Sequence, residues 1–125
     1  MTLSKADTTV NELSSFRYTG QVVDEEGNAI PGSSLSSLTL TLYNAADKSI
    51  INSRDKQDVL DANAVTVNES GDLTWDSVSG DSPIVGSVGI GQAEQHVALF
   101  EWTWGSNRRG SHLLTLYVVQ MHEVP

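Results

Sequence analysis

The chain has 125 residues, the length of one typical domain, and its 16 acidic against 7 basic residues give a formal net charge of -9. Because cysteine is absent, a disulfide framework, a thiol nucleophile and cysteine-ligated zinc or iron–sulfur centres are excluded. The acidic balance argues against nucleic acid as a partner, and no apolar run is long enough to form a membrane-spanning helix.

The first segment, residues 1–15, is polar and rich in threonine and serine, with Leu3, Val10 and Leu13 as isolated apolar positions. Neither the period of a strand nor that of a helix is present. We therefore predict a flexible polar N-terminal arm, which either frays or becomes ordered on a neighbouring subunit. The remainder, residues 16–125, is expected to form a single domain.

Two strands are predicted early in this domain. Residues 16–23 are dominated by β-favouring types, whereas residues 24–32 combine acidic side chains with Gly-Asn and Pro-Gly pairs that are typical of turns. Residues 38–43 alternate between leucine and threonine or tyrosine, which indicates a half-buried strand.

The next segment is less regular. Residues 44–48 have the composition of a turn, and residues 49–51 are expected to form a short strand. Residues 54–60 are charged, and we predict a helical turn there, capped by Asn52 or Ser53.

A hairpin and a long loop follow. Residues 65–67 and 72–75 are predicted to pair through a short loop that ends in Gly71. Residues 76–92, rich in glycine, serine and aspartate, are expected to form a loop, and loops of such length are usually functional or disordered.

The last predicted elements are two strands joined by a turn. Residues 94–104 and 111–119 both alternate, and residues 105–110 form the turn. One face of the first strand carries the largest side chains, His96, Ala98, Phe100, Trp102 and Trp104. Since apolar residues occur on both faces of this hairpin, we expect it to lie centrally and to be partly covered on both sides.

Short strands separated by frequent turn signals, without a long helix, predict an all-β protein. An antiparallel β-sandwich is the favoured architecture, and a small barrel is the alternative. The sequence has no internal repeat at a fixed period, so a solenoid or a propeller is not expected.

The histidines and acidic residues do not predict a metal site. If the hairpin turn is symmetric about residues 107–108, His96 lies opposite Val119 and not opposite His112, so these two and His122 do not converge. The acidic clusters lack the spacing of an EF-hand, although a calcium site in another kind of loop is left open.

No catalytic or cofactor-binding residues are predicted. Glu94 and Glu101 are seven residues apart on one strand, so they fall on opposite faces and do not form a glycosidase pair. The chain contains no G-x-S-x-G nucleophile elbow. A small hydrolase is therefore the least favoured class of function.

Two pairs of residues are candidates for binding. Trp102 and Trp104 share a face and could stack on a sugar, although tryptophans at such positions also fill a core or an interface. Arg108 and Arg109 form a basic pair at the predicted hairpin tip, which is either an exposed turn or a contact to an acidic partner.

Several segments together resemble small structural proteins of tailed bacteriophages. These segments are residues 38–43, 50–60, 72–75, 81–85 and 96–104. The resemblance extends over residues 16–120 and implies an immunoglobulin-like β-sandwich with no catalytic residues.

The resemblance also implies a role. We expect a virion component that is assembled in the host cytoplasm as a head decoration, a neck or head–tail connector, or a tail-associated protein. Its partners would be capsid, portal, neck or tail subunits, and it would form a symmetric homo-oligomer or lattice. The candidate interaction residues are Leu3, Val10, Leu13, Arg108 and Arg109. The alternative function is a carbohydrate- or host-receptor-binding module that uses Trp102 and Trp104.

Overall fold

The computed structural model describes residues 5–86 and 88–121, so Leu3 and His122 lie outside the described residues. Most of the ordered elements are strands, with two short 3-10 helices. The elements are β1 (Lys5–Asn11), β2 (Arg17–Gln21), η1 (Gly32–Ser34), β3 (Leu35–Asn44), β4 (Gln57–Asp58), β5 (Val65–Val67), β6 (Asp72–Asp76), η2 (Ser79–Asp81), β7 (Ala93–Trp104) and β8 (Arg108–Val119).

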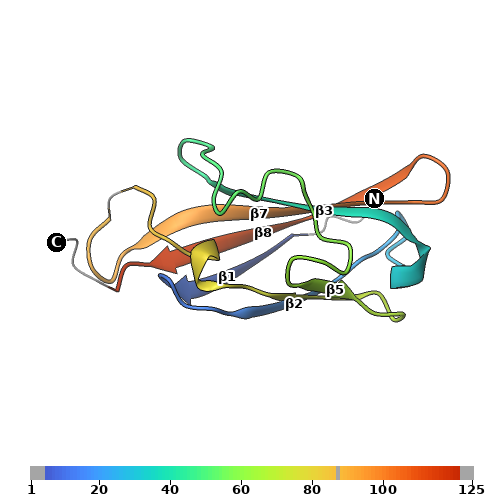
Figure 1. Ribbon diagram of the computed structural model, residues 1–125, viewed down its shortest axis with the longest axis horizontal. Coiled ribbons are helices and arrows are strands. Elements are labelled where there is room, and N and C mark those ends of the chain that lie inside the picture. The colour runs from blue at the N-terminus through green and yellow to red at the C-terminus, as the bar shows by residue number, and fades with distance from the viewer. Residues whose placement is uncertain (1–4, 87, 122–125) are drawn as a thin grey trace.

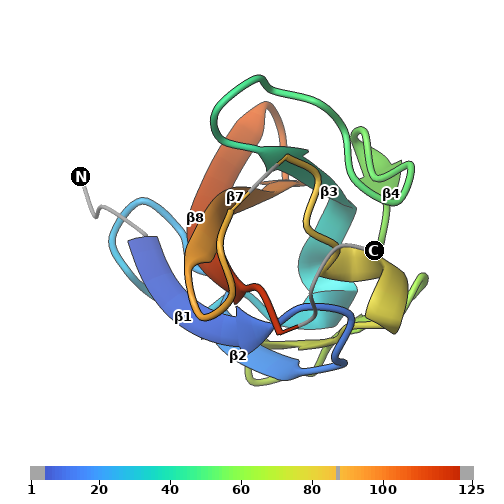
Figure 2. The same cartoon turned by 90° about the vertical axis from the view of Figure 1, so that its left-hand side faces the viewer.

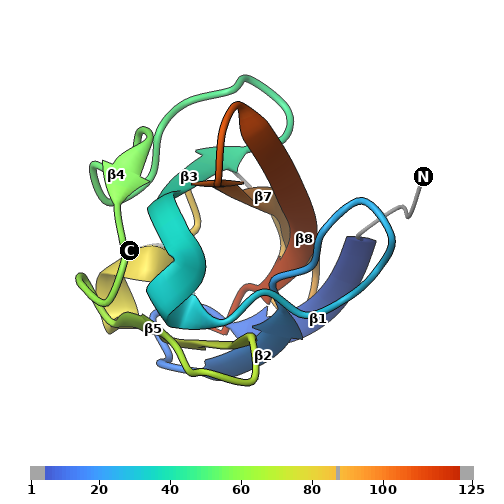
Figure 3. The same ribbon diagram turned by 90° about the vertical axis from the view of Figure 1, so that its right-hand side faces the viewer.

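The strands form two sheets, as predicted for an all-β sandwich. One sheet has the order β1-β8-β7-β3-β4 and the other has the order β2-β6-β5. Figures 2 and 3 show both sheets curving around a shared interior, with β1 next to β2 where the two sheets meet. All paired strands are antiparallel except β1 and β8, which are parallel.

The predicted N-terminal arm is wrong for residues 5–11, because they form an edge strand. In β1 the backbone pairs with β8 from Lys5 opposite Leu113 to Asn11 opposite Val119. The side chain of Val10 is buried in the core, while Asp7 and other polar residues at alternate positions are exposed. The segment forms a strand because the open edge of β8 offers backbone hydrogen-bond partners. The weak alternation of apolar and polar residues in this segment did not predict that pairing.

The strongest alternations form strands as predicted. In β3 the inward residues Leu38, Leu40 and Leu42 are fully buried. Strands β5 and β6 form the predicted hairpin, with Val65 opposite Trp75. The rings of Phe16 and Phe100 both meet the Trp75 ring edge to face, with centroid distances of 5.0 and 5.8 Å, and so connect the two sheets through the core.

The predicted helical turn at residues 54–60 is wrong. Lys56 has a φ of 49°, in the left-handed region that a right-handed helix excludes, and the proposed caps Asn52 and Ser53 have positive φ as well. The segment instead turns twice and adds the two-residue strand β4 next to β3. Its local structure is set by the buried side chain of Arg54, which packs inside the fold.

The predicted pairing of the last hairpin is wrong by three residues. Trp104 lies opposite Arg108, so the link is centred on residue 106, and His96 lies opposite Leu116 instead of Val119. The link is short because Gly105 and Asn107 both adopt positive φ, which lets the two strands continue close to the tip.

Candidate functional site: an apolar outer sheet face

The outer face of the smaller sheet is an ordinary solvent face. Its outward positions carry threonine, glutamine, arginine and aspartate only: Arg17, Thr19, Gln21, Thr66, Asp72, Thr74 and Asp76. The Nε atom of Arg17 lies 2.5 Å from Oδ1 of Asp76 in an exposed ion pair between β2 and β6. Such alternation of buried apolar and exposed polar residues is what a sandwich strand requires.

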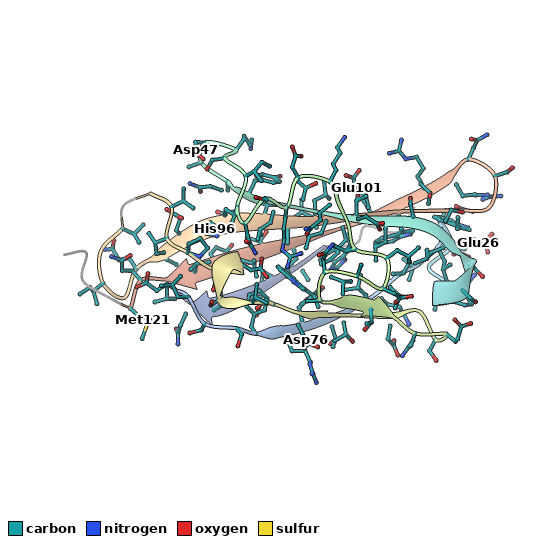
Figure 4. All side chains as sticks on the ribbon, in the orientation of Figure 1. Glu26, Asp47, Asp76, His96, Glu101 and Met121 are labelled. Atoms are coloured by element: carbon teal, nitrogen blue, oxygen red, sulfur yellow. The ribbon has the colours of Figure 1, made fainter. Side chains whose placement is uncertain are left out.

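The outer face of the larger sheet is different, because β3, β7 and β8 carry apolar residues at outward positions as well. These residues, which we call the outer apolar face, are Tyr43, Val97, Leu99, Leu113, Tyr117 and Val119. Figure 4 marks the geometry: Glu101 points away from β2 and β5, Asp76 points away on the opposite side, and His96 lies between the layers.

The cross-strand register places these side chains in adjoining rows. Leu99 lies between Thr41 of β3 and Leu113 of β8, and Val97 lies in the next row beside Tyr43. Val97 is only 7% exposed, whereas Tyr117 is 39% exposed. Contiguous apolar side chains on an outer face mark an interaction surface more often than an ordinary solvent face.

Charge is sparse on this face. The outward positions of β3, β7 and β8 include one acidic residue, Glu101, and one basic residue, Arg109. They lie on neighbouring strands, with Glu101 opposite Ser111 and Arg109 opposite Thr103. Neither belongs to the ion pairs found among the described residues. The outward positions of these three strands therefore carry no net formal charge, although the ammonium of Lys48 lies over the Tyr43 ring, 5.6 Å from its centroid.

The candidate interaction residues predicted from the sequence are scattered in the structure. Val10 is 8% exposed and belongs to the core, so its predicted role in contacts with a partner is wrong. Leu13 is exposed and lies near Met121, at the end of the molecule away from Glu26 (Figure 4), since Glu12 receives the Met121 N–H at 2.8 Å. Leu3 lies outside the described residues.

The two arginines of the hairpin have different surroundings. Arg108 pairs with Glu25 of the turn that follows β2, which connects that turn to the start of β8. Arg109 is exposed, and its outward position places it at the border of the outer apolar face. The basic pair therefore splits, and only Arg109 is available at this face.

The predicted sugar platform of Trp102 and Trp104 is not formed. Trp102 is 1% exposed, and its Nε1–H donates to the Val23 carbonyl at 3.2 Å. The ring lies so close to Gly110 that a Cβ there would come within 2.4 Å of Trp102 Nε1. A buried ring has no face to offer a sugar, because the inner side of β7 looks toward the other sheet.

A buried carboxylate–imidazole pair, which the sequence reasoning missed, anchors the loop before β7. Glu94 Oε1 lies 2.5 Å from Nε2 of His96, and its carboxylate accepts the N–H groups of Val85 at 2.8 Å and Gly86 at 2.7 Å. Burial alone would raise the pKa of Glu94, but these hydrogen bonds outweigh burial and lower it. His96 Nδ1 is buried and has no partner among the described residues. The sequence signal for this pair was that Glu94 and His96 lie two residues apart, and therefore on the same inward face of β7.

An open hollow of about 520 Å³ lies beside this anchor, between residues 44–47 and the loop. Its acidic groups already have partners, since Asp47 accepts hydrogen bonds from the N–H and hydroxyl of Ser49 and Glu94 holds the loop. We therefore assign the hollow no ligand.

A second buried pair holds η2 against the core. Arg54 Nε lies 2.6 Å from Asp81 Oδ1, and Nη2 lies 3.1 Å from Oδ2. Asp81 also accepts the Asn52 amide at 2.7 Å and the Val78 N–H at 3.0 Å. All of these contacts join the irregular segments at residues 52–54 and 78–81.

The remaining histidine on a strand, His112, lies in the seam between β8 and β2. Its Nε2 hydrogen-bonds the Tyr18 hydroxyl, and the two rings stack with centroids 5.7 Å apart. Burial raises the pKa of Tyr18 and lowers that of His112. His96 and His112 do not converge, and within residues 5–86 and 88–121 no group of three or more histidines and acidic residues is placed to hold a metal.

Comparison of the chain with protein-family models gives no match, and comparison with curated proteins gives none either. Across the part of the chain that the structure describes, no helix is long and apolar enough to cross a membrane.

Proposed function

We propose that the chain is a non-enzymatic structural component of a tailed-phage virion that binds other virion proteins through the outer apolar face. The observation that carries the proposal is the contrast between the two outer faces. One is polar and charged, whereas the other carries apolar side chains at outward positions of β3, β7 and β8, of which Tyr117 is exposed and Tyr43, Leu99, Leu113 and Val119 are half-buried. A face of this kind gains free energy when a partner removes it from water.

The proposed domain type is immunoglobulin-like, and the strand order supports it. Strands β2, β6 and β5 take the places of B, E and D, and β3, β7 and β8 take those of C, F and G, with β4 as C′. Two features depart from antibody domains: the cysteine pair is absent, and the core tryptophans lie on β6 and β7. The proposal concerns the fold of that family and not the function of antibodies.

The proposed setting is the phage particle, assembled in the host cytoplasm, with capsid, portal, neck or tail subunits as partners. It rests on the sequence resemblance together with the outer apolar face. The alternative of a carbohydrate- or receptor-binding module loses its paired platform because Trp102 is buried, so we do not favour it.

Cryo-electron microscopy of purified virions tests the proposal, with density assigned to this chain. We expect copies in a number set by the symmetry of the capsid, neck or tail. Phage that encode Leu99→Lys should incorporate fewer copies than phage that encode Thr74→Lys, because Thr74 lies on the polar outer face of the other sheet. Particles that contain no copies of the wild-type chain would refute the proposed function.

A further inference from the structure

We infer that β1 exchanges between two copies of the chain, so that β1 of each copy lies beside β8 of the other. The partner is therefore a second copy, and the segment that it contributes is residues 5–12. The inference is independent of the proposed function, because it concerns the edge of β8 and not the outer apolar face.

The edge of β8 is a binding site for one parallel strand, and the structure shows which sequence fits it. β1 fills this site along its whole length, beginning with Lys5 opposite Leu113. On the inward side of β1, Val10 is buried in the core and Ala6 packs against the core. Because β1 of a second copy has the same residues, it makes the same backbone and core contacts.

β1 is held in place by its backbone and by few side-chain contacts. No side chain of residues 6–11 forms a hydrogen bond or an ion pair with any part of the chain that the structure describes. The inward side chains are Ala6, Thr8 and Val10, and only Val10 is buried. Release of β1 therefore breaks little besides the strand pairing, which exchange restores.

The contacts on either side of Leu13 divide the chain into a part that moves and a part that stays. Before Leu13, Glu12 belongs with β8, because its N–H donates to the last carbonyl of β8 at 2.9 Å and its carboxylate accepts the Met121 N–H at 2.8 Å. After Leu13, the Ser14 carbonyl accepts the Ser82 hydroxyl at 2.9 Å. Leu13 is therefore the hinge of the exchange.

The hinge is strained in the unexchanged chain. Leu13 has a φ of 56°, a left-handed conformation that bulky residues rarely adopt, and its side chain is 53% exposed, so burial does not offset the strain. Two hydrogen bonds close this turn, from the Leu13 N–H to the Ser82 carbonyl at 2.8 Å and from the Ser14 N–H to the Asn11 carbonyl at 3.2 Å. Exchange replaces these two bonds with bonds to water and relieves the strained φ. Short strained hinges favour strand exchange for this reason.

The surroundings of the hinge suit the approach of a second copy. β1 ends and β2 begins at the end of the molecule that carries Met121, opposite Glu26, so exchanged copies meet there (Figure 4). Residues 88–93 at this end contain no charged residue, and Ile90 and Met121 are 58% and 50% exposed. Two acidic chains therefore meet beside a loop without charge, where apolar side chains gain free energy by covering one another.

Disulfide cross-linking between two singly substituted chains tests the inference directly, because the natural chain has no cysteine. Thr9 of β1 lies opposite Tyr117 of β8, and both side chains are exposed. We expect Thr9→Cys and Tyr117→Cys chains, refolded together at high concentration and oxidised, to form a disulfide between residues 9 and 117 that mass spectrometry identifies. The matched control pairs Tyr117→Cys with Thr66→Cys, an exposed position of β5. Cross-linking of residues 9 and 117 no greater than in this control would overturn the inference.

Substitutions of Leu13 give a second readout with opposite signs. Leu13→Pro cannot adopt positive φ, so it should shift the chain from 13.5 kDa toward twice that mass in sedimentation velocity. Leu13→Gly accepts positive φ without strain and should weaken the dimer by about tenfold or more. Leu13→Ala keeps the strain and should resemble wild type. A folded Leu13→Pro chain that is monomeric at every concentration would overturn the inference, as would Leu13→Gly that dimerises more than Leu13→Ala.

The outcomes are separate from those for the proposed function. A chain that exchanges β1 in solution but is absent from virions keeps the inference and overturns the proposed function. A chain that is present in virions but forms no disulfide between residues 9 and 117 of two copies keeps the proposed function and overturns the inference.

Discussion

Removing the carboxylate of Asp81 should destabilise the domain severely. Asp81 accepts four hydrogen bonds, two of them from the Arg54 guanidinium, whose side chain is only 5% exposed. Asp81→Ala leaves that guanidinium buried without its counter-ion, which costs about 3–5 kcal/mol. A domain of ordinary stability holds about 5–15 kcal/mol in all, so the loss is a large fraction of the total.

The measurement is urea unfolding followed by tryptophan fluorescence, since Trp75 is buried beside the Arg54 guanidinium at 5.7 Å. With a slope of about 2 kcal/mol per molar urea, the midpoint should fall by about 2 M. The matched control is Asp76→Ala, which removes an acid from the exposed pair with Arg17 and should change the midpoint little.

A double variant distinguishes the cost of leaving Arg54 buried without a counter-ion from the loss of the Arg54–Asp81 interaction itself. Arg54→Met with Asp81→Leu removes both charges and fills the space with apolar atoms, so it should recover most of the stability lost in Asp81→Ala. The reasoning is refuted if Asp81→Ala unfolds at the same urea concentration as Asp76→Ala. It is also refuted if the double variant is less stable than the single one.

Two further predictions concern close packing and the loop anchor. Gly110→Ala should destabilise the chain by about 1–3 kcal/mol, because the new Cβ would lie 2.4 Å from Trp102 Nε1; an unchanged urea midpoint would contradict this. Glu94→Gln should speed amide exchange at Val85 and Gly86 while leaving exchange in β5 and β6 unchanged, and protection equal to wild type would contradict it. Because the pKa of Glu94 is lowered in the folded state, its stabilisation is present above the ordinary carboxyl pKa and is lost as pH falls through the lowered value. The wild-type chain should therefore lose more stability on acidification than Glu94→Gln does.

Strands with strong alternation could be predicted from the sequence, and the reason is local. The leucines of β3 and the large residues of β7 differ sharply from their neighbours, so period two is unmistakable there. In β1 the inward residues are Ala6, Thr8 and Val10, which scarcely differ in character from the threonines and polar residues around them. That strand exists because β8 offers an edge, which is a property of the folded sheet and not of the segment.

The apolar residues on the outer side of β7 and β8 were visible in the sequence, whereas the buried charge pairs were not. Apolar residues on both faces of β7 and β8 predicted a central hairpin that is partly covered on both sides, and the structure places both strands inside the larger sheet, between β1 and β3. The Arg54–Asp81 pair joins residues 27 apart in two irregular segments, and no periodicity connects them. The hairpin register failed for a similar reason, since the length of the link depends on positive φ at Gly105 and Asn107.

The parallel pairing of β1 with β8 has a consequence for synthesis on the ribosome. Lys5 and Leu113 are partners, yet 113 − 5 = 108 residues separate them in the chain. Until β8 emerges, β1 has no strand beside which to add, and contacts of such long range slow folding to the millisecond-to-second class. Between the emergence of β8 and the docking of β1, the edge of β8 is uncovered and can pair with strands of other chains. Rapid translation of many copies side by side should therefore favour aggregation at this edge, and late docking of β1 ends that vulnerability.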